Sequence, residues 1–101
     1  MSDTIEKLVK TIKSRKENDV KLSYTSFLLS KGSNYCLNKI REELKELEDA
    51  IKNKKNTIHE SADVIYHLLV TLESAEINFD DIMKELNNRE EISGFEEKRN
   101  R

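Results

Sequence analysis

The sequence contains no proline and no tryptophan, and it has only two glycines among 101 residues. Few positions therefore interrupt a helix, whereas lysine, glutamate and leucine, which favour helices, are abundant. Long apolar runs are also missing, since no segment approaches the roughly 20 apolar residues that a membrane-spanning helix needs. The composition predicts an all-α protein, and we expect it to have no membrane partner.

An excess of one charge is missing too. Eighteen basic and twenty acidic residues give a net charge of −2, so no overall positive field favours binding to nucleic acid. The single cysteine, Cys36, cannot form an internal disulfide, and the N-terminal segment MSDTIEKLVK lacks the apolar core of a secretory signal. We therefore expect a cytoplasmic protein with a single domain over residues 1–101.

Apolar residues recur every three or four positions along most of the chain, a period that is typical of helices packed on one face. Gly32 is expected to end the second helix, because glycine tolerates the left-handed conformation found at helix ends. The tail, residues 92–101, is expected to be flexible. The pattern predicts helices at about 2–12, 23–30, 33–54, 57–76 and 78–90.

The predicted helix 57–76 is apolar on nearly all sides. Ile58, Ile65 and Leu72 follow a heptad spacing, and Tyr66 and Leu68 add apolar groups on other faces. Such a helix must be covered on more than one side, and the chain has few other helices to cover it. We therefore expect a helical bundle of about four to five helices per chain that is completed by dimerisation, as a homodimer or a dimer of dimers.

Two pairs of acidic residues interrupt the predicted helices 33–54 and 57–76. Glu43 and Glu46 lie three positions apart, as do Glu60 and Asp63, so each pair lies on one face of its helix. If the two helices pack antiparallel, the pairs face each other, and carboxylates that close need a cation between them. Where phosphates are the substrate, Mg²⁺ is the expected ion, because it is a hard cation that prefers oxygen ligands.

A solvated helix face is the alternative explanation, because glutamates at this spacing are common on exposed helices. Glu60 and Asp63 are harder to explain in this way, since their helix is otherwise committed to burial. His67 lies one turn further on and either touches the site or forms a hydrogen bond at an interface, whereas His59 is expected to be exposed. Cys36 has no obvious base beside it, so nucleophilic catalysis is not expected.

Several blocks of the sequence resemble the phosphoribosyl-ATP pyrophosphohydrolase family, one of the all-α nucleoside-triphosphate pyrophosphohydrolases. The superfamily signature, Glu-x-x-Glu followed by Glu-x-x-Asp, is present at 43–46 and 60–63. Two positions depart from the family pattern: Arg41-Glu-Glu-Leu44 replaces Gly-Glu-Glu-Ala, and Asn88-Arg89 replaces a pair of arginines. The blocks that are specific to the family are Ser23-Tyr-Thr, Leu28-Leu-Ser-Lys-Gly32, Asp63-Val-Ile-Tyr-His-Leu-Leu-Val70 and Ser93-Gly-Phe-Glu-Glu-Lys98.

The resemblance implies hydrolysis of phosphoribosyl-ATP to phosphoribosyl-AMP and pyrophosphate, the second step of histidine biosynthesis. It implies that the proton acceptor is Glu43 or the adjacent Glu42. It also implies Mg²⁺ as cofactor, with the ligands Glu43, Glu46, Glu60 and Asp63. The basic residues expected to bind the substrate phosphates are Lys31, Lys39, Arg89 and Lys98.

Two other functions remain open on the sequence. The first is a related pyrophosphohydrolase that acts on a free nucleotide such as dUTP or dCTP. The second is a non-enzymatic helical interaction module, in which the acidic pairs are merely solvated.

Overall fold

The computed structural model describes residues 2–90, which form five α-helices and no strand. The all-α prediction is confirmed for these residues, and each predicted helix boundary lies within two residues of the observed one. The tail at 92–101, which was predicted to be flexible, lies outside the described residues. The helices are α1 (Ser2–Ser14), α2 (Tyr24–Lys31), α3 (Ser33–Asn53), α4 (Thr57–Ser74) and α5 (Phe79–Glu90).

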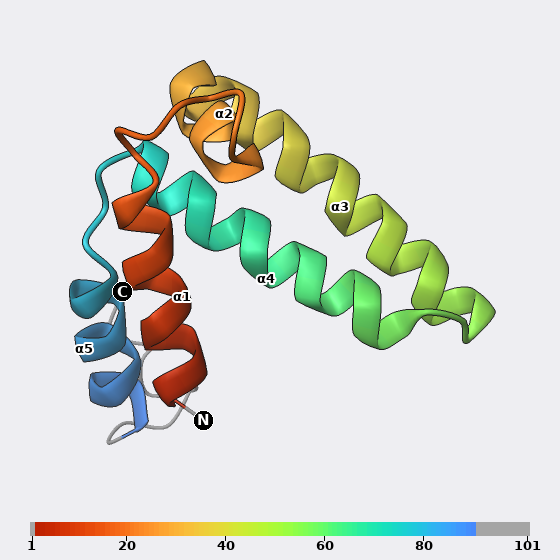
Figure 1. Cartoon of the computed structure of the whole chain (residues 1–101). Helices are drawn as coiled ribbons and strands as arrows, with labels where there is room; N and C mark the ends of the chain where they lie inside the picture. The colour runs from red at the N-terminus through yellow and green to blue at the C-terminus, as the bar shows by residue number, and fades with distance from the viewer. Residues whose placement is uncertain (1, 91–101) are drawn as a thin grey trace.

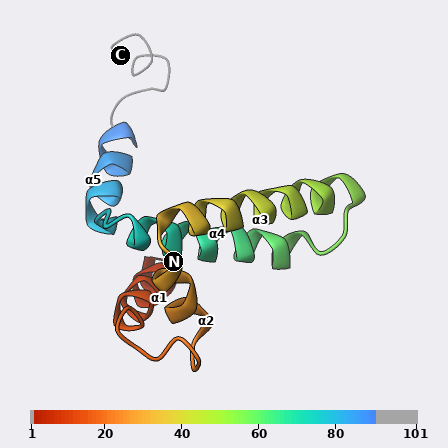
Figure 2. The same ribbon diagram turned by 90° about the horizontal axis from the view of Figure 1, so that it is seen from above.

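Helices α3 and α4 form a long antiparallel hairpin, and α1, α2 and α5 gather at the end away from its turn (Figures 1 and 2). At the turn, Lys54 adopts a left-handed φ of 56° and donates its backbone N–H to the carbonyls of Ala50 and Ile51. Asn56 is also left-handed, with φ 60°, and α4 begins at the next residue. Within the described residues, the half of the hairpin next to the turn has no other helix over it.

The hydrophobic core lies where α1 and α2 pack against the other half of the hairpin. The connection between α1 and α2 is held onto this core by polar contacts. The buried Ser26 donates a hydrogen bond from Oγ to the carbonyl of Arg15 at 2.6 Å, and Lys16 Nζ lies 3.4 Å from Glu73 Oε2 on α4. The buried apolar residues of the core are Ile12, Leu28, Cys36, Leu69 and Val70.

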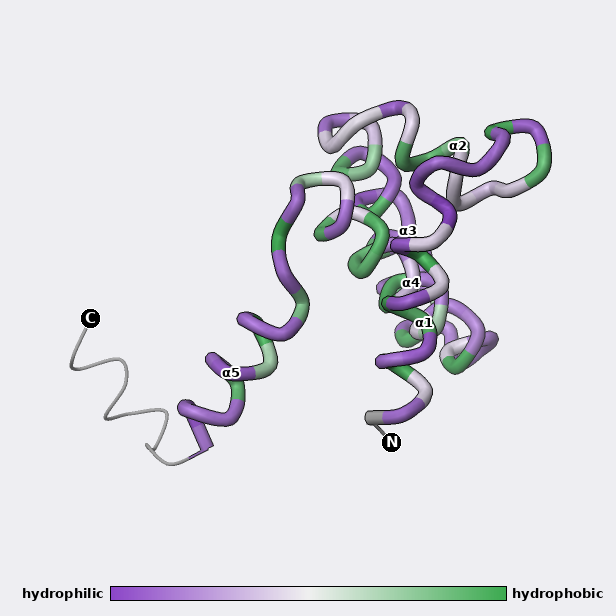
Figure 3. Tube along the Cα trace, turned by 60° about the vertical axis from the view of Figure 1, so that its left-hand side comes forward, coloured by the Kyte–Doolittle hydropathy of each residue, from purple (hydrophilic) through white to green (hydrophobic). Residues whose placement is uncertain are grey.

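Helix α5 is mostly hydrophilic along its length (Figure 3) and has no buried residue. Phe79, Ile82 and Met83 are half-buried, but Leu86 is 48% exposed. Helix α5 therefore packs against the rest of the chain only over its first turns. None of the helices in residues 2–90 is long and apolar enough to cross a lipid bilayer.

The hairpin has two unlike flanks. One flank carries the two acidic pairs, and the other carries large apolar side chains that remain open to solvent. Ile58, the most open of them, is 86% exposed, and Ile51 is 60% exposed. On α3, Cys36 and Ala50 are the buried residues, whereas Leu37, Leu44 and Ile51 are exposed. The apolar flank, as it is called below, consists of Leu37, Leu44, Ile51, Ile58, Ile65 and Leu68.

Gly32 alone joins α2 to α3, and it ends α2, the second helix, as predicted. Its backbone adopts φ 89° and ψ 172°, a combination that is essentially restricted to glycine. Because only one residue separates the helices, Lys31 at the end of α2 lies against the first turn of α3, with its Nζ 5.3 Å from the centre of the Tyr35 ring. The connection thus sets where this lysine lies.

Replacing Gly32 by alanine should lower the free energy of unfolding by about 1–3 kcal/mol, the usual cost of a non-glycine residue in this backbone region. A Cβ at this position would meet no atom within 4 Å, so the cost is backbone strain rather than a clash. Chemical denaturation measures the change. Asn34→Ala, at an exposed position two residues away, serves as the control and should change stability by less than about 0.5 kcal/mol. Equal stability of Gly32→Ala and wild type would contradict the conclusion that this backbone conformation requires glycine.

Candidate metal centre

The hairpin brings the four predicted carboxylates together between its two helices. Oxygens of Glu43, Glu46 and Glu60 lie within 4.8 Å of one another. A second group, of His59, Glu60 and Asp63, meets the same limit, so Glu60 is shared by both groups. The antiparallel packing of α3 and α4 produces this arrangement, because it places one turn of each helix opposite the other. The role of these residues as metal ligands stays a prediction.

Glu43 is the member of the cluster whose charge is least compensated by its surroundings. Its Oε2 is buried and has no hydrogen-bond partner among the described residues. Burial raises the pKa of this carboxyl above its ordinary value, and the Glu46 and Asp63 carboxylates raise it further, against an opposing effect of His67. An ionised carboxylate in this position lacks a compensating charge, which a bound cation would supply.

The two histidines of α4 lie on either side of Asp63. His59 has a side chain that is 74% exposed, as expected, but its Nε2 lies 3.3 Å from Asp63 Oδ2, so it belongs to the cluster. This contact was not predicted from the sequence, although His59 lies four residues before Asp63 and next to Glu60 in the chain. An open hollow of about 290 Å³ lies beside the cluster, against the hairpin turn, and is lined in part by Glu46 and Glu60.

His67 is buried and links α4 to α2. Its Nδ1 lies 2.8 Å from the carbonyl oxygen of Asp63, so this nitrogen carries the proton and donates it. Nε2 is then the acceptor for the Tyr24 hydroxyl, at 3.3 Å. His67 thus forms buried hydrogen bonds within this chain, and the bond to Asp63 places it beside the acidic cluster.

Aromatic rings extend from the cluster towards α2. The Tyr24 ring stacks between Phe27, at a centroid distance of 6.3 Å, and Tyr66, at 6.4 Å. Tyr66 is further held by a hydrogen bond between its hydroxyl and Thr25 Oγ1. Burial raises the pKa of the Tyr24 hydroxyl, which also experiences the charges of Lys39 and Glu43. This hydroxyl therefore lies close to the acidic cluster.

The predicted phosphate-binding residues are not all near the cluster. Lys39 lies one turn before Glu43 on α3, and its Nζ is 3.8 Å from Glu42, which is exposed and outside both carboxylate groups. Arg89 lies on α5, at the end of the molecule away from the hairpin turn (Figures 1 and 2), and contacts Glu85 at 2.9 Å. Within this chain it does not reach the cluster, and Lys98 lies outside the described residues.

The fold and the site define a class: an all-α protein in which two antiparallel helices hold an acidic cluster suited to a divalent cation. Comparison with known proteins narrows this class. A profile of the phosphoribosyl-ATP pyrophosphohydrolase family matches residues 5–90. The chain therefore belongs to the phosphoribosyl-ATP pyrophosphohydrolase family.

Individual relatives support the same assignment over nearly the whole chain. A phosphoribosyl-ATP pyrophosphatase of Dechloromonas aromatica is 43% identical, covering 98% of this chain and 94% of the relative. Proteins with the same name from Clostridium novyi and Roseobacter denitrificans are 43% and 40% identical, covering 91% and 97% of this chain and 86% and 95% of theirs. The family resemblance in the sequence is confirmed.

Glu43→Gln should raise the Tm of the metal-free protein, because it removes a buried charge that opposes folding. The folded carboxyl has a raised pKa, so the wild type loses stability as the pH rises from the ordinary carboxyl range towards that higher pKa. The variant should lose less over the same interval. Thermal denaturation in EDTA, from mildly acidic to neutral pH, measures both effects.

Glu48→Gln is the matched control, because it removes the same charge from an exposed position on α3 that pairs only with Lys52 at 2.7 Å among the described ion pairs. Its Tm should stay close to that of the wild type. Added Mg²⁺ should raise the Tm of the wild type and of the control, but not that of Glu43→Gln. A metal-free Glu43→Gln protein less stable than wild type would contradict this account.

Proposed function

We propose that this protein hydrolyses phosphoribosyl-ATP to phosphoribosyl-AMP and pyrophosphate, the second step of histidine biosynthesis. The observation that carries the proposal is the meeting of Glu43, Glu46, Glu60 and Asp63 between two helices, in a chain of this family. A triphosphate is strongly anionic, so bare carboxylates would repel it. The site therefore needs a cation to accept such a substrate.

Magnesium fits the donor set. The cluster offers carboxylate oxygens, which Mg²⁺ prefers, and the buried Glu43 Oε2 lacks any other partner among the described residues. Glu43, Glu46, Glu60 and Asp63 would hold the ion. When bound, it supplies positive charge that offsets the phosphate oxygens and acidifies the attacking water.

The proton of the attacking water passes to Glu43 rather than to Glu42. Glu43 is the better placed of the two, because its carboxylate lies within 4.8 Å of Glu46 and Glu60 and has a buried oxygen with no other partner among the described residues. Glu42 is exposed and turned towards Lys39. His67 keeps α4 in register beside this carboxyl, through its hydrogen bonds to Asp63 and Tyr24. Catalysis is then mainly positioning and charge stabilisation.

The proposal includes a second copy of the chain packed on the apolar flank. Leu37, Leu44 and Ile51 repeat every seven residues on α3, the spacing of helices that pack side by side. Ile58, Ile65 and Leu68 on α4 are exposed as well, and large apolar side chains left open to solvent in such number are typical of interfaces. The acidic cluster lies on the opposite flank, so this pairing leaves it open to substrate. We also place the protein in the cytoplasm, in keeping with the free thiol of Cys36.

Purified protein should release pyrophosphate from phosphoribosyl-ATP in the presence of Mg²⁺, with a higher kcat/KM than for ATP, dUTP or dCTP. A coupled assay for pyrophosphate measures these rates. Glu60→Gln should lower kcat/KM by more than about 100-fold, because Glu60 belongs to both carboxylate groups and even indirect partners of metal sites contribute 10–100-fold.

Glu48→Gln again serves as the control and should retain wild-type activity, because its side chain lies outside both carboxylate groups. Turnover of dUTP equal to or above that of phosphoribosyl-ATP would overturn the substrate assignment. Full activity of a folded Glu60→Gln protein would overturn the site assignment.

Ile58→Glu should convert the protein to a monomer, because it places a charge in the proposed interface at its most exposed apolar residue. Light scattering coupled to size-exclusion chromatography measures the mass. Leu22→Glu is a matched control, since Leu22 is equally open, at 84% exposed, but lies in the connection before α2. It should leave the assembly intact. A wild-type protein that is monomeric at micromolar concentration would contradict the proposed pairing of two chains.

A further inference from the structure

Two lysines approach the same aromatic ring at the N-terminal end of α3. Lys31 Nζ lies 5.3 Å from the centre of the Tyr35 ring, and Lys39 Nζ lies 5.8 Å from it. Lys31 also lies 6.0 Å from the centre of the Phe27 ring. Two ammonium groups are thus held beside one ring, where cation–π attraction restricts their motion. Lys31, Tyr35 and Lys39 are called the Tyr35 patch below.

The positive charge of this patch is only partly balanced. Among the described residues, Lys39 has one ion pair, a loose one of 3.8 Å with the exposed Glu42. Lys31 has no carboxylate within ion-pair distance in the same part of the chain. Lys45 and Lys52, further along α3, are by contrast matched by carboxylates at 3.2 and 2.7 Å. The Tyr35 patch therefore has charge available for an anion.

The patch lies on the same flank of the hairpin as the acidic cluster, but at a distance from it. Tyr35, Lys39 and Glu43 follow one another at intervals of four residues and so share a helix face. The eight residues from Tyr35 to Glu43 span about 12 Å along the helix axis. The half-exposed Tyr24 ring, stacked on Phe27 and Tyr66, lies on the same flank as Lys39 and Glu43. The charges of both residues act on the pKa of its hydroxyl, which burial raises.

A phosphoribosyl-ATP molecule carries phosphate at two ends, the triphosphate and the phosphate of the added ribosyl group. We propose that the Tyr35 patch binds the phosphate of the phosphoribosyl group, while the acidic cluster handles the triphosphate. This inference rests on the proposed function and names the contact by which the enzyme distinguishes its substrate from ATP. The two substrates share the base and the triphosphate, so the distinction must come from the added group. The open Tyr24 ring offers a stacking surface for the base between the two ends.

Lys31→Met and Lys39→Met should each weaken binding of the product phosphoribosyl-AMP by about 10–100-fold, the usual effect of losing a charged hydrogen-bond donor to phosphate. Binding of AMP, which lacks the phosphoribosyl group, should change by less than about twofold. Titration calorimetry with the two purified nucleotides measures both dissociation constants. Lys31→Arg, which keeps the charge, should restore most of the lost affinity.

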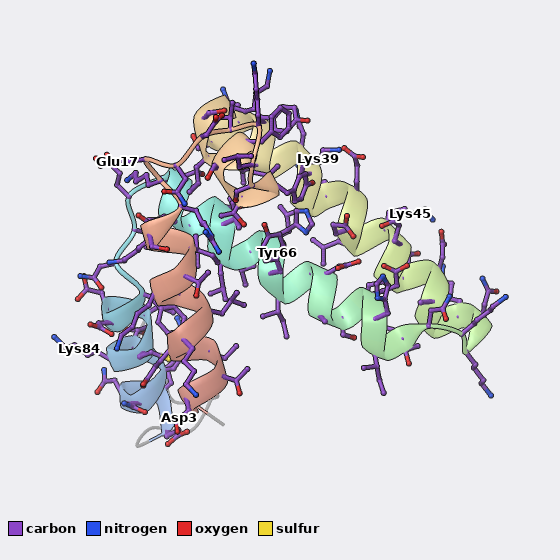
Figure 4. The ribbon with its side chains drawn as sticks, in the orientation of Figure 1. Asp3, Glu17, Lys39, Lys45, Tyr66 and Lys84 are labelled. Carbon is purple, nitrogen blue, oxygen red and sulfur yellow. The ribbon has the colours of Figure 1, made fainter. Side chains whose placement is uncertain are left out.

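Lys45→Met is the matched control, because Lys45 lies on the same helix but further towards the hairpin turn (Figure 4), where it pairs with Asp49. It should leave both dissociation constants unchanged. The kcat/KM for phosphoribosyl-ATP should fall with Lys31→Met and Lys39→Met by the same factor as the affinity for phosphoribosyl-AMP, mainly through KM.

The outcomes separate this inference from the proposed function. Equal losses for AMP and phosphoribosyl-AMP would place the lysines on the other phosphates and overturn the inference, and unchanged binding of both nucleotides would overturn it too. In either case, pyrophosphate release from phosphoribosyl-ATP by the wild type would leave the proposed function standing. If the wild type releases none, the proposed function fails, whatever the lysine variants bind.

Discussion

Mutual repulsion among the carboxylates held between α3 and α4 is the constraint on which the rest of the structure depends. Glu43, Glu46 and Glu60 lie within 4.8 Å of one another, and Glu43 has a buried oxygen without a partner among the described residues. Such a cluster destabilises the isolated chain, so packing elsewhere must hold the hairpin together. The core of α1 and α2 against one end of the hairpin supplies that packing, and leaves the other end for the site.

The two flanks of the hairpin differ in chemical character: one carries the acidic pairs, and the other carries large exposed apolar side chains. Water solvates the carboxylates on one side of α4 well, but exposure of the isoleucines on its other side to water is unfavourable. In the function that we propose, the polar flank accepts a cation and a phosphorylated substrate, and the apolar flank accepts a second copy of the chain. Burial of the apolar flank in the proposed dimer would offset part of the electrostatic repulsion within the acidic cluster. The buried His67 connects α4 to α2, through its hydrogen bonds to the backbone of Asp63 and to the Tyr24 hydroxyl.

Much of the fold follows from local patterns. The periods of apolar residues and the position of Gly32 predict every described helix to within two residues, because helix formation is governed by neighbours three and four positions away. The pairing of Glu43 with Glu46 and of Glu60 with Asp63 is visible for the same reason. Which face of α3 is buried does not follow from its apolar spacing, because Leu37, Leu44 and Ile51 are exposed while Cys36 and Ala50 are buried by the way α4 packs.

The sequence by itself determined the helices, the two acidic pairs and the family, since each of these is written in local spacing or in residue identity. Only the tertiary structure decided that Glu60 meets Glu43 and Glu46, and that Lys31 lies beside Tyr35. These contacts join residues on different helices, and their distances depend on how the helices cross. The contact of His59 with Asp63 lies within α4, but it depends on side-chain conformations that the sequence does not specify. The same packing separated Arg89 from the cluster, because α5 lies at the opposite end of the hairpin.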